Sequence, residues 1–255
     1  MRTQFTELTD SQWQVIHLML SKQTPKKLCL RKVCNALFFL TSTGIQWRNL
    51  PPAYPKWQSV YYYFRKWQKN GTFSLMMNYL RKQARMSQGR EPSPSLAIVD
   101  SQSVKTAAFI NQKKGLDGHK KVNGRKRHLA VDTLGYPLAV YVGPANEHDG
   151  QAGLALLAML DQQHFHRLTT IRADHAYRGT FSESAKYFDW QVDTRQSAPS
   201  PDKGFVPQEN RWQIERSFAW LNFFRRLSKD YEKTTASAQA FIMIALCSIM
   251  LAKIH

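Results

Sequence analysis

The sequence has few acidic residues for its length. Its 255 residues include 18 Asp and Glu against 36 Lys and Arg, which leaves a formal charge of +18 at pH 7. An enzyme that acts on small neutral molecules does not need such an excess. Lys and Arg side chains raise a protein's affinity for nucleic acid, because each phosphate that they neutralise releases bound counterions. The scarcity of acids therefore favours a polyanionic partner, with nucleic acid first.

Cysteine and long apolar runs are scarce as well. The three cysteines form no C-x-x-C pair, and neither Cys nor His shows zinc spacing, which excludes a closed disulfide framework and a zinc finger. The longest apolar stretch, 240–251, is interrupted by Ser248 and is shorter than the ~20 residues of a spanning helix. The first ten residues lack the apolar core of a signal peptide. We expect a cytoplasmic protein without a membrane partner.

The first 95 residues are the most basic part of the chain. They contain 15 basic and 3 acidic residues, a net charge of +12, and the overall hydrophobic fraction of 43% excludes disorder. Apolar residues recur at helical spacing in four segments: one starting at Thr9, 30–43, one starting near Trp57, and 73–86. Gly44 stands where a left-handed C-cap would end the second helix. Glycine and prolines then mark 87–95 as a linker.

After this linker the pattern alternates between strands and helices. We expect strands at 96–99, 127–131, 138–142, 168–173 and 190–192, and helices at 151–162, 181–188, 209–226 and 236–254. Asp149 is the expected cap of the first of these helices, and the last helix is expected to cover the sheet, with a dimer surface as the second interpretation. The basic block 113–127 is expected to be a flexible connection. The order indicates an α/β fold with a mixed sheet flanked by helices.

Three acidic residues occupy positions that an ordinary solvent-exposed surface role explains poorly. Asp100 is expected to close the first strand, Asp174 closes the strand at 168–173, and Glu215 has apolar neighbours in a late helix. Each alone is more often a turn former, a cap or a surface residue. Together, three carboxylates at one sheet edge suit Mg²⁺ or Mn²⁺, and two such ions can clamp an in-line phosphoryl displacement. The acids therefore predict a metal-dependent site.

Several strings resemble the DDE-type transposases of small bacterial insertion sequences. They are Ile98–Lys105, Ala145–Asp149, Arg172–Gly179, Arg211–Glu232 and, near the N-terminus, 44–52. The resemblance spans nearly the whole chain. It implies a small all-α DNA-binding domain at 1–90 and a ribonuclease-H-like DDE catalytic domain at 91–255. It also implies that Asp100, Asp174 and Glu215 are the catalytic, metal-binding triad.

The related proteins carry a Tyr, an Arg and a Lys around the Glu of the triad. Here Arg211 fills the Arg position, whereas Gln208 stands where the Tyr belongs and Asn222 where the Lys belongs. Arg225 or Arg226 are the candidate replacements as phosphate contacts.

We expect DNA contacts from exposed cations and a few aromatic residues. The candidates are Tyr61, Tyr62, Arg65, Lys66, Lys69, Lys105, Lys120, Lys121, Arg125, Lys126, Arg127, Arg211, Arg216, Arg225 and Arg226. For the block 113–127 the alternative is a solvated hairpin, and for Lys105 it is an ordinary surface lysine. In the third helix, Trp57, Phe64 and Trp67 are expected to be packing residues.

The resemblance implies a transposase that uses Mg²⁺, with Mn²⁺ as a substitute. It would bind the terminal inverted repeats of its element as double-stranded DNA, cut a strand and transfer the free 3′-hydroxyl to target DNA. Pairing two ends requires a homodimer or a higher assembly on DNA, at the nucleoid of a bacterial cytoplasm. The alternative is a non-catalytic DNA-binding regulator or domesticated remnant. A third interpretation is a nuclease of the same fold that cleaves without strand transfer.

Overall fold

The computed structural model describes residues 5–20, 28–194 and 211–254, and for Arg211 the backbone alone. The elements follow the chain in the order α1 (Asp10–Leu20), α2 (Leu30–Thr43), η2 (Trp47–Asn49), α3 (Trp57–Lys69), α4 (Thr72–Met86), β1 (Leu96–Lys105), β2 (Gly115–Asp117), β3 (Val122–Val131), β4 (Pro137–Pro144), α5 (Asp149–Asp161), β5 (Thr170–Arg172), η3 (His175–Tyr177), α6 (Thr180–Lys186), β6 (Gln191–Asp193), α7 (Arg211–Leu221), η4 (Arg225–Leu227) and α8 (Thr235–Leu251). Helices thus come first, and strands alternate with helices after them.

The four N-terminal helices begin within one residue of the predicted positions, and α2 and α4 also end where the sequence predicts. At the start of α1, the hydroxyl of Thr9 accepts from the backbone N–H of Gln12, and the Gln12 amide oxygen accepts from the N–H of Thr9, both at 3.2 Å. This reciprocal pair is a capping box. At the end of α2, Gly44 takes a φ of 73° and its N–H donates to the carbonyl of Leu40. The predicted left-handed cap is confirmed.

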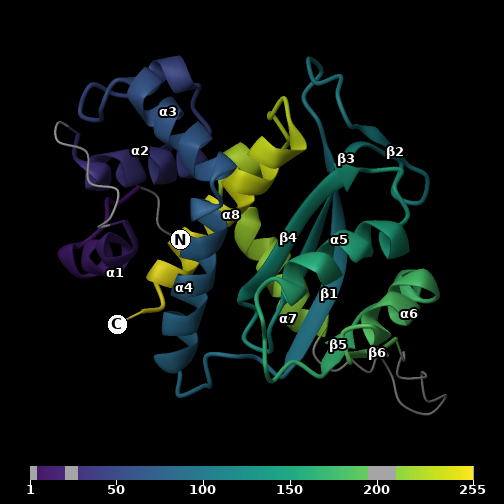
Figure 1. The fold of residues 1–255 in the computed structure, drawn as a ribbon. Helices are drawn as coiled ribbons and strands as arrows, with labels where there is room; N and C mark the ends of the chain where they lie inside the picture. The colour runs from purple at the N-terminus through teal and green to yellow at the C-terminus, as the bar shows by residue number, and fades with distance from the viewer. Residues whose placement is uncertain (1–4, 21–27, 195–210, 255) are drawn as a thin grey trace, which may run out of the picture.

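Six strands of the described chain form one mixed sheet. The path is β2-β3-β1-β5-β6, and β4 also pairs with β3. Strand β3 is antiparallel to its neighbours β1, β2 and β4, whereas β1 pairs in parallel with β5, and β5 in parallel with β6. Helices α5 and α6 cover one face, and α4, α7 and α8 cover the other (Figure 1). This is the mixed sheet flanked by helices, behind a helical region, that the sequence predicts.

Helix α8 lies between the N-terminal helices and the sheet (Figure 1). Its side chains are apolar all round, and it is buried on most sides because α2, α3, α4 and β4 all pack against it. Phe241 of α8 stacks on Phe64 of α3, with ring centroids 4.8 Å apart. The helix therefore covers the sheet as predicted and joins the N-terminal helices to the same apolar core. The division at residue 90 remains a prediction from the sequence.

Four predictions about local structure are wrong. Strand β1 does not end at Asp100 but continues to Lys105, and the basic block at 113–127 forms β2 and the first half of β3 instead of a flexible connection. Asp149 lies inside α5, whose N-cap is His148, because the ring of His148 accepts from the N–H of Gly150. The helix expected at 209–226 ends at Leu221 and is followed by the short helix η4. The first part of that expected helix lies outside the described residues.

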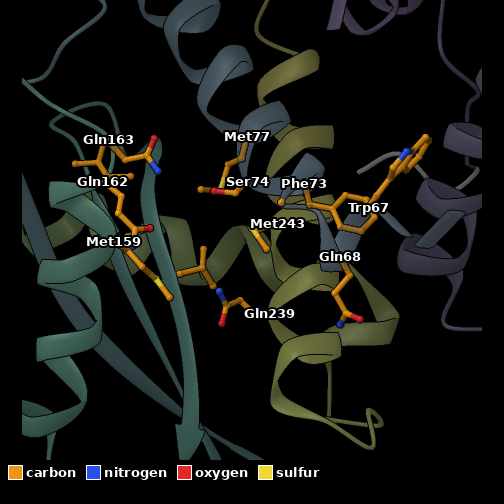
Figure 2. A pocket seen from close by; sticks show the side chains of 14 residues that line it. Trp67, Gln68, Phe73, Ser74, Met77, Met159, Gln162, Gln163, Gln239 and Met243 are labelled. Atoms are coloured by element: carbon orange, nitrogen blue, oxygen red, sulfur yellow. The ribbon is translucent and has the colours of Figure 1, made fainter. Parts of the chain in front are cut away.

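A cleft of about 240 Å³ opens between α4, α8, β4 and α5 (Figure 2). Its wall carries glutamines and methionines, among them Gln163, Gln239 and Met243, and none of its lining residues is titratable. Acid–base or metal chemistry therefore has no group to use there. Within the described parts of the chain, we find no helix with the length and apolarity needed to cross a bilayer.

Candidate active site where β1 and β5 lie side by side

The strand register brings two of the three predicted acids to one level. The parallel strands β1 and β5 pair Leu96 with Thr170 and Ile98 with Arg172. Continued by two residues, the same register sets Asp100 beside Asp174. Neighbouring strands are about 4.8 Å apart, and residues two apart on a strand share a face. Extrapolated in this way, Asp100 of β1 lies level with Asp174, which follows the last residue of β5 and is not itself part of the sheet.

Local hydrogen bonds fix the backbone at both acids. Asp174 is the N-cap of η3, where its Oδ1 accepts from the N–H of Ala176 at 2.9 Å. This bond turns the chain away from the sheet immediately after β5. Asp100 lies within β1, and its Oδ1 accepts from the N–H of Ser101 at 2.7 Å. Both carboxylates are half-buried, so solvent and a substrate can reach them.

Helix α7 places Glu215 over the same face of the sheet. Ile214 and Phe218 of α7 are buried in the core that also holds Ile98, two residues before Asp100 on the same face. Ser217 anchors the helix by donating to the carbonyl of Gly135 at 2.8 Å. Glu215 itself is exposed. In the described part of the chain, no group of three or more His, Cys, Asp or Glu side chains has the arrangement of a metal site. The register of β1 and β5 thus sets Asp100 and Asp174 at one level, and the described residues do not show the predicted triad as a metal site.

A buried tyrosine lies behind the acids on the opposite face. Tyr177 is fully buried, and its hydroxyl lies 3.2 Å from Nδ1 of His128. Burial raises the pKa of Tyr177 well above its usual range, and the negative charges of Asp149, Asp100 and Asp174 raise it further. The negative charges of these carboxylates therefore lie close enough to act on the buried phenol.

His128 stays neutral at this position. Burial lowers the pKa of His128 to about 4, Asp149 opposes the shift, and the nearby cations of Lys126 and Lys120 add to it. Lys126 is buried as well, with Nζ 2.8 Å from Asp149 and 3.0 Å from the carbonyl of Glu147. Sequence reasoning missed Tyr177 and His128. The available signal for Tyr177 is its place three residues after Asp174, inside the string that carries the resemblance.

The predicted DNA contacts fall into two groups. The first group is exposed: Tyr61, Tyr62, Arg65, Lys66 and Lys69 on α3, Lys105 at the end of β1, Lys120 and Lys121 before β3, and Arg225. On α3, Phe64 and Trp67 are buried, so the prediction that they are packing residues is confirmed. The side chain of Arg211 and all of Gln208 lie outside the described residues.

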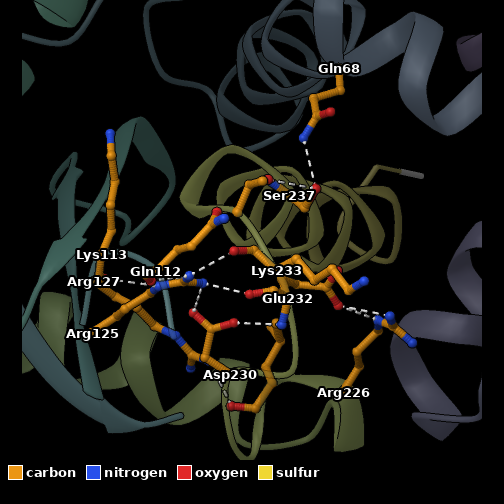
Figure 3. Close-up of polar contacts among 12 residues, drawn as sticks. Gln68, Gln112, Lys113, Arg125, Arg127, Arg226, Asp230, Glu232, Lys233 and Ser237 are labelled. Carbon is orange, nitrogen blue, oxygen red and sulfur yellow. Dashed lines mark hydrogen bonds and ion pairs between the residues drawn. The ribbon is translucent and has the colours of Figure 1, made fainter. Parts of the chain in front are cut away.

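The second group is turned into the protein. Arg125 is fully buried and pairs with Asp230 at 3.1 Å, and Arg226 is held by Glu232 at 2.7 Å (Figure 3). Arg216 donates to the carbonyl of Leu134 and lies over the rings of two tryptophans. These guanidinium groups hold chain segments together, so we do not keep Arg125, Arg216 or Arg226 as DNA contacts. Lys126 is likewise committed to Asp149, as described above.

Arg226 also connects η4 to the N-terminal helices. Its Nη1 donates to the carbonyl of Ile45 at 3.1 Å, and its guanidinium carbon lies 4.1 Å from the ring centroid of Phe241. Gly44 fits closely against this segment, because a Cβ there would lie 3.2 Å from backbone atoms of Arg225 and Arg226. The segment after α7 is therefore fixed to both halves of the molecule.

The chain matches known protein families in both its N-terminal and its C-terminal part. Residues 91–250 match the family described as "Transposase DDE domain", and residues 8–77 match the one described as "Putative transposase of IS4/5 family". The chain is also 30% identical over 131 residues to the "Putative transposase for insertion sequence element IS402" of Burkholderia cepacia. That alignment covers 49% of this chain and 62% of the relative's length.

The chain belongs to the DDE transposases of small insertion sequences, because the DDE match covers more than half of its residues. Its fold is therefore the ribonuclease-H-like one expected from the resemblance. Enzymes of this family act on DNA and depend on divalent metal ions. Two half-buried carboxylates, Asp100 in β1 and Asp174 shortly after β5, are donors that suit a hard cation of this kind.

Proposed function

We propose that this protein is an insertion-sequence transposase that binds the terminal inverted repeats of its element, cuts a DNA strand and joins it to target DNA. The observation that carries the proposal is the position of Asp100 and Asp174 at one level of two adjacent strands in a chain of the DDE family. Glu215, on the helix across the same face, is the proposed third member.

In the proposed reaction a water oxygen attacks a phosphodiester and the bond from phosphorus to the 3′-oxygen breaks. This leaves a 3′-hydroxyl and a 5′-phosphate. The 3′-hydroxyl then attacks a phosphodiester of the target, and the target's own 3′-oxygen leaves. Asp100, Asp174 and Glu215 would hold Mg²⁺, with Mn²⁺ as a substitute. Such an ion activates the attacking oxygen and stabilises the leaving one.

The exposed cations of α3 support the proposal that the N-terminal helices bind the element's ends. Arg65, Lys66 and Lys69 line a groove of about 550 Å³ together with Tyr62 and with Ala236 of α8. A groove with three cations fits a phosphate backbone, whose contacts position a duplex without reading its sequence. Two ends must meet, so we propose a homodimer or higher assembly on DNA, acting at the bacterial nucleoid. A monomeric active species on paired-end DNA, measured by complex mass, would contradict the assembly.

The experiment that tests the function is a nicking and joining assay with a duplex that carries the element's end. The proposal expects cleavage in Mg²⁺ or Mn²⁺, followed by covalent joining to a second duplex. Cleavage without joining would indicate a nuclease instead. Binding without cleavage in either metal would indicate a regulator or remnant that only occupies the DNA.

A further inference from the structure

A second cleft lies along the strand that carries Asp100. It has a volume of about 230 Å³ and lies between the ends of β1 and β3 and the segment after α7. Its lining residues are mostly polar or cationic: Gln102, Ser103, Val104, Lys105, Val122, Arg127, Asn222, Leu227, Ser228 and Lys229. It contains no carboxylate among these residues, so its charge is positive. A cleft of this kind fits an anion.

The floor of the cleft holds a buried arginine with spare donors. Arg127 is 3% exposed, and its one hydrogen bond among the described residues runs from Nη2 to the carbonyl of Leu227 at 2.8 Å. A guanidinium has five N–H donors. Burial lowers the pKa of Arg127 to about 10, with the charge of Asp230 opposing the shift. Asp230, however, is already paired with Arg125.

A second polar group on the same floor is also unsatisfied. Gln102 lies directly opposite Arg127 in the β1–β3 ladder, and its buried Oε1 has no hydrogen-bond partner within the described chain. Buried polar atoms are rarely left in this state unless a ligand or water completes them. A phosphodiester has no proton to donate to this oxygen, so the donors that this floor offers to an anion are those of Arg127.

The cleft lies one short step from the candidate active site. Gln102 is two residues beyond Asp100 on the same face of β1, which corresponds to about 7 Å along the strand. Successive nucleotides of a DNA strand rise about 3.4 Å along the axis. A strand whose scissile phosphate lies at Asp100 and Asp174 therefore has its neighbouring phosphates within reach of the cleft.

We propose that this cleft binds a backbone phosphate of the DNA strand being cut, one or two nucleotides from the scissile phosphate. Arg127 anchors the phosphate from the floor, and the exposed cations Lys105 and Lys229 contact it from the rim. Asn222 and Ser228 lie on the same wall. The inference rests on the proposed function, since it assumes that a DNA strand enters at Asp100.

The test scans the phosphates next to the cut with single neutral methylphosphonates and measures duplex affinity by fluorescence anisotropy without divalent metal. In the full-length protein, one modified position within two nucleotides of the cut is expected to weaken binding roughly tenfold, the size expected for one charge-assisted contact. Lys229→Gln should weaken binding to the unmodified duplex and lose its sensitivity at that position. Lys82→Gln, which changes an exposed lysine of α4 outside the cleft, should keep the wild-type profile.

Duplex binding by Arg127→Gln is a second test of the same contact. The unfolding midpoint of this variant shows whether any loss of binding results from loss of the fold. The proposal is overturned if Lys229→Gln keeps the wild-type profile, or if no phosphate within two nucleotides of the cut matters. Equal affinity for an RNA duplex of the same sequence would overturn the assignment to DNA. If millimolar inorganic phosphate abolishes the dependence of affinity on the modified phosphate, and Lys229→Gln binds the duplex as tightly as wild type, the cleft holds an adventitious anion only. The scan counts phosphates from the end of the element and measures binding alone, so it can be interpreted even if the protein does not cleave there.

Discussion

The clearest quantitative prediction concerns Arg125, whose cation serves the fold. Its guanidinium donates to five acceptors: Asp230 Oδ2 at 3.1 Å and the carbonyls of Gln112, Lys113, Glu232 and Lys233 at 2.7 to 3.2 Å (Figure 3). Both charged side chains of the ion pair are at most 2% exposed. Replacing Arg125 by Met leaves the Asp230 carboxylate buried without its partner. It also removes the hydrogen-bond donor from each of the four carbonyls.

Breaking a buried ion pair on one side costs about 3–5 kcal/mol, because the remaining charge stays desolvated. For a chain of this size that corresponds to a fall in Tm of roughly 6–20 °C. The free energy of unfolding, measured by urea titration with circular dichroism, should fall by this amount in Arg125→Met. Lys120→Met, which removes an exposed cation nearby, should stay within about 0.5 kcal/mol of wild type. A stable Arg125→Met with tenfold weaker DNA binding would refute the reasoning and return Arg125 to the DNA surface.

Because the pKa of His128 is lowered to about 4 in the fold, from about 6.5 in the unfolded chain, unfolding takes up a proton in acid. Stability is therefore full above pH 6.5 and falls by about 1.4 kcal/mol per pH unit down to pH 4; His128→Asn should lack this slope in urea titrations, and an unchanged slope would contradict the assignment. Gly44→Ala should destabilise by about 1–2 kcal/mol because its φ of 73° disfavours a side chain, whereas Gly118→Ala, with open space around its Cβ, should be near neutral in Tm. Replacing Arg65 and Lys66 together by Gln should lower the salt dependence of DNA binding by about two ions and leave Tm unchanged; an unaltered salt slope would exclude α3 from the DNA surface.

Local rules were sufficient for much of this fold. The capping box at Thr9 and the left-handed Gly44 involve residues within four positions of each other, so their patterns determine the helix ends. The alternation of strands and helices after residue 95 likewise identified the sheet and placed Asp174 after β5. These features depend on backbone conformation and apolar periodicity, which the sequence displays directly.

The wrong predictions about charged residues concern side chains whose ion-pair partners lie far away in the sequence. The sequence predicts Arg125 as a DNA contact because its partner Asp230 is 105 positions later and cannot be recognised from local spacing. Arg85 of α4 also has a distant partner, the fully buried Asp132, and so connects α4 to the sheet. By its sequence position Asp132 lies before a turn, and it does accept from the turn N–H groups of Leu134 and Tyr136. Its buried ion pair depends on the tertiary fold.

The site shows the same division between local and long-range information. Asp100 and Asp174 were predicted as neighbours, and the parallel register of β1 and β5 sets them at one level. The position of Glu215 depends on how α7 packs over that face, which sequence spacing does not specify. The buried pair of Tyr177 and His128, from η3 and β3, required the three-dimensional structure because the two residues are 49 positions apart.

The central claim is that Asp100, Asp174 and Glu215 hold the catalytic metal. The most direct measurement replaces each in turn by Cys and compares strand cleavage in Mg²⁺ and in Mn²⁺, with duplex binding measured alongside. A thiolate is a poor ligand for Mg²⁺ but is accepted more readily by Mn²⁺. The account predicts that each Cys variant binds DNA normally, fails to cleave in Mg²⁺ and recovers cleavage in Mn²⁺. Cleavage in Mg²⁺ at the wild-type rate by any of the three variants would contradict the account.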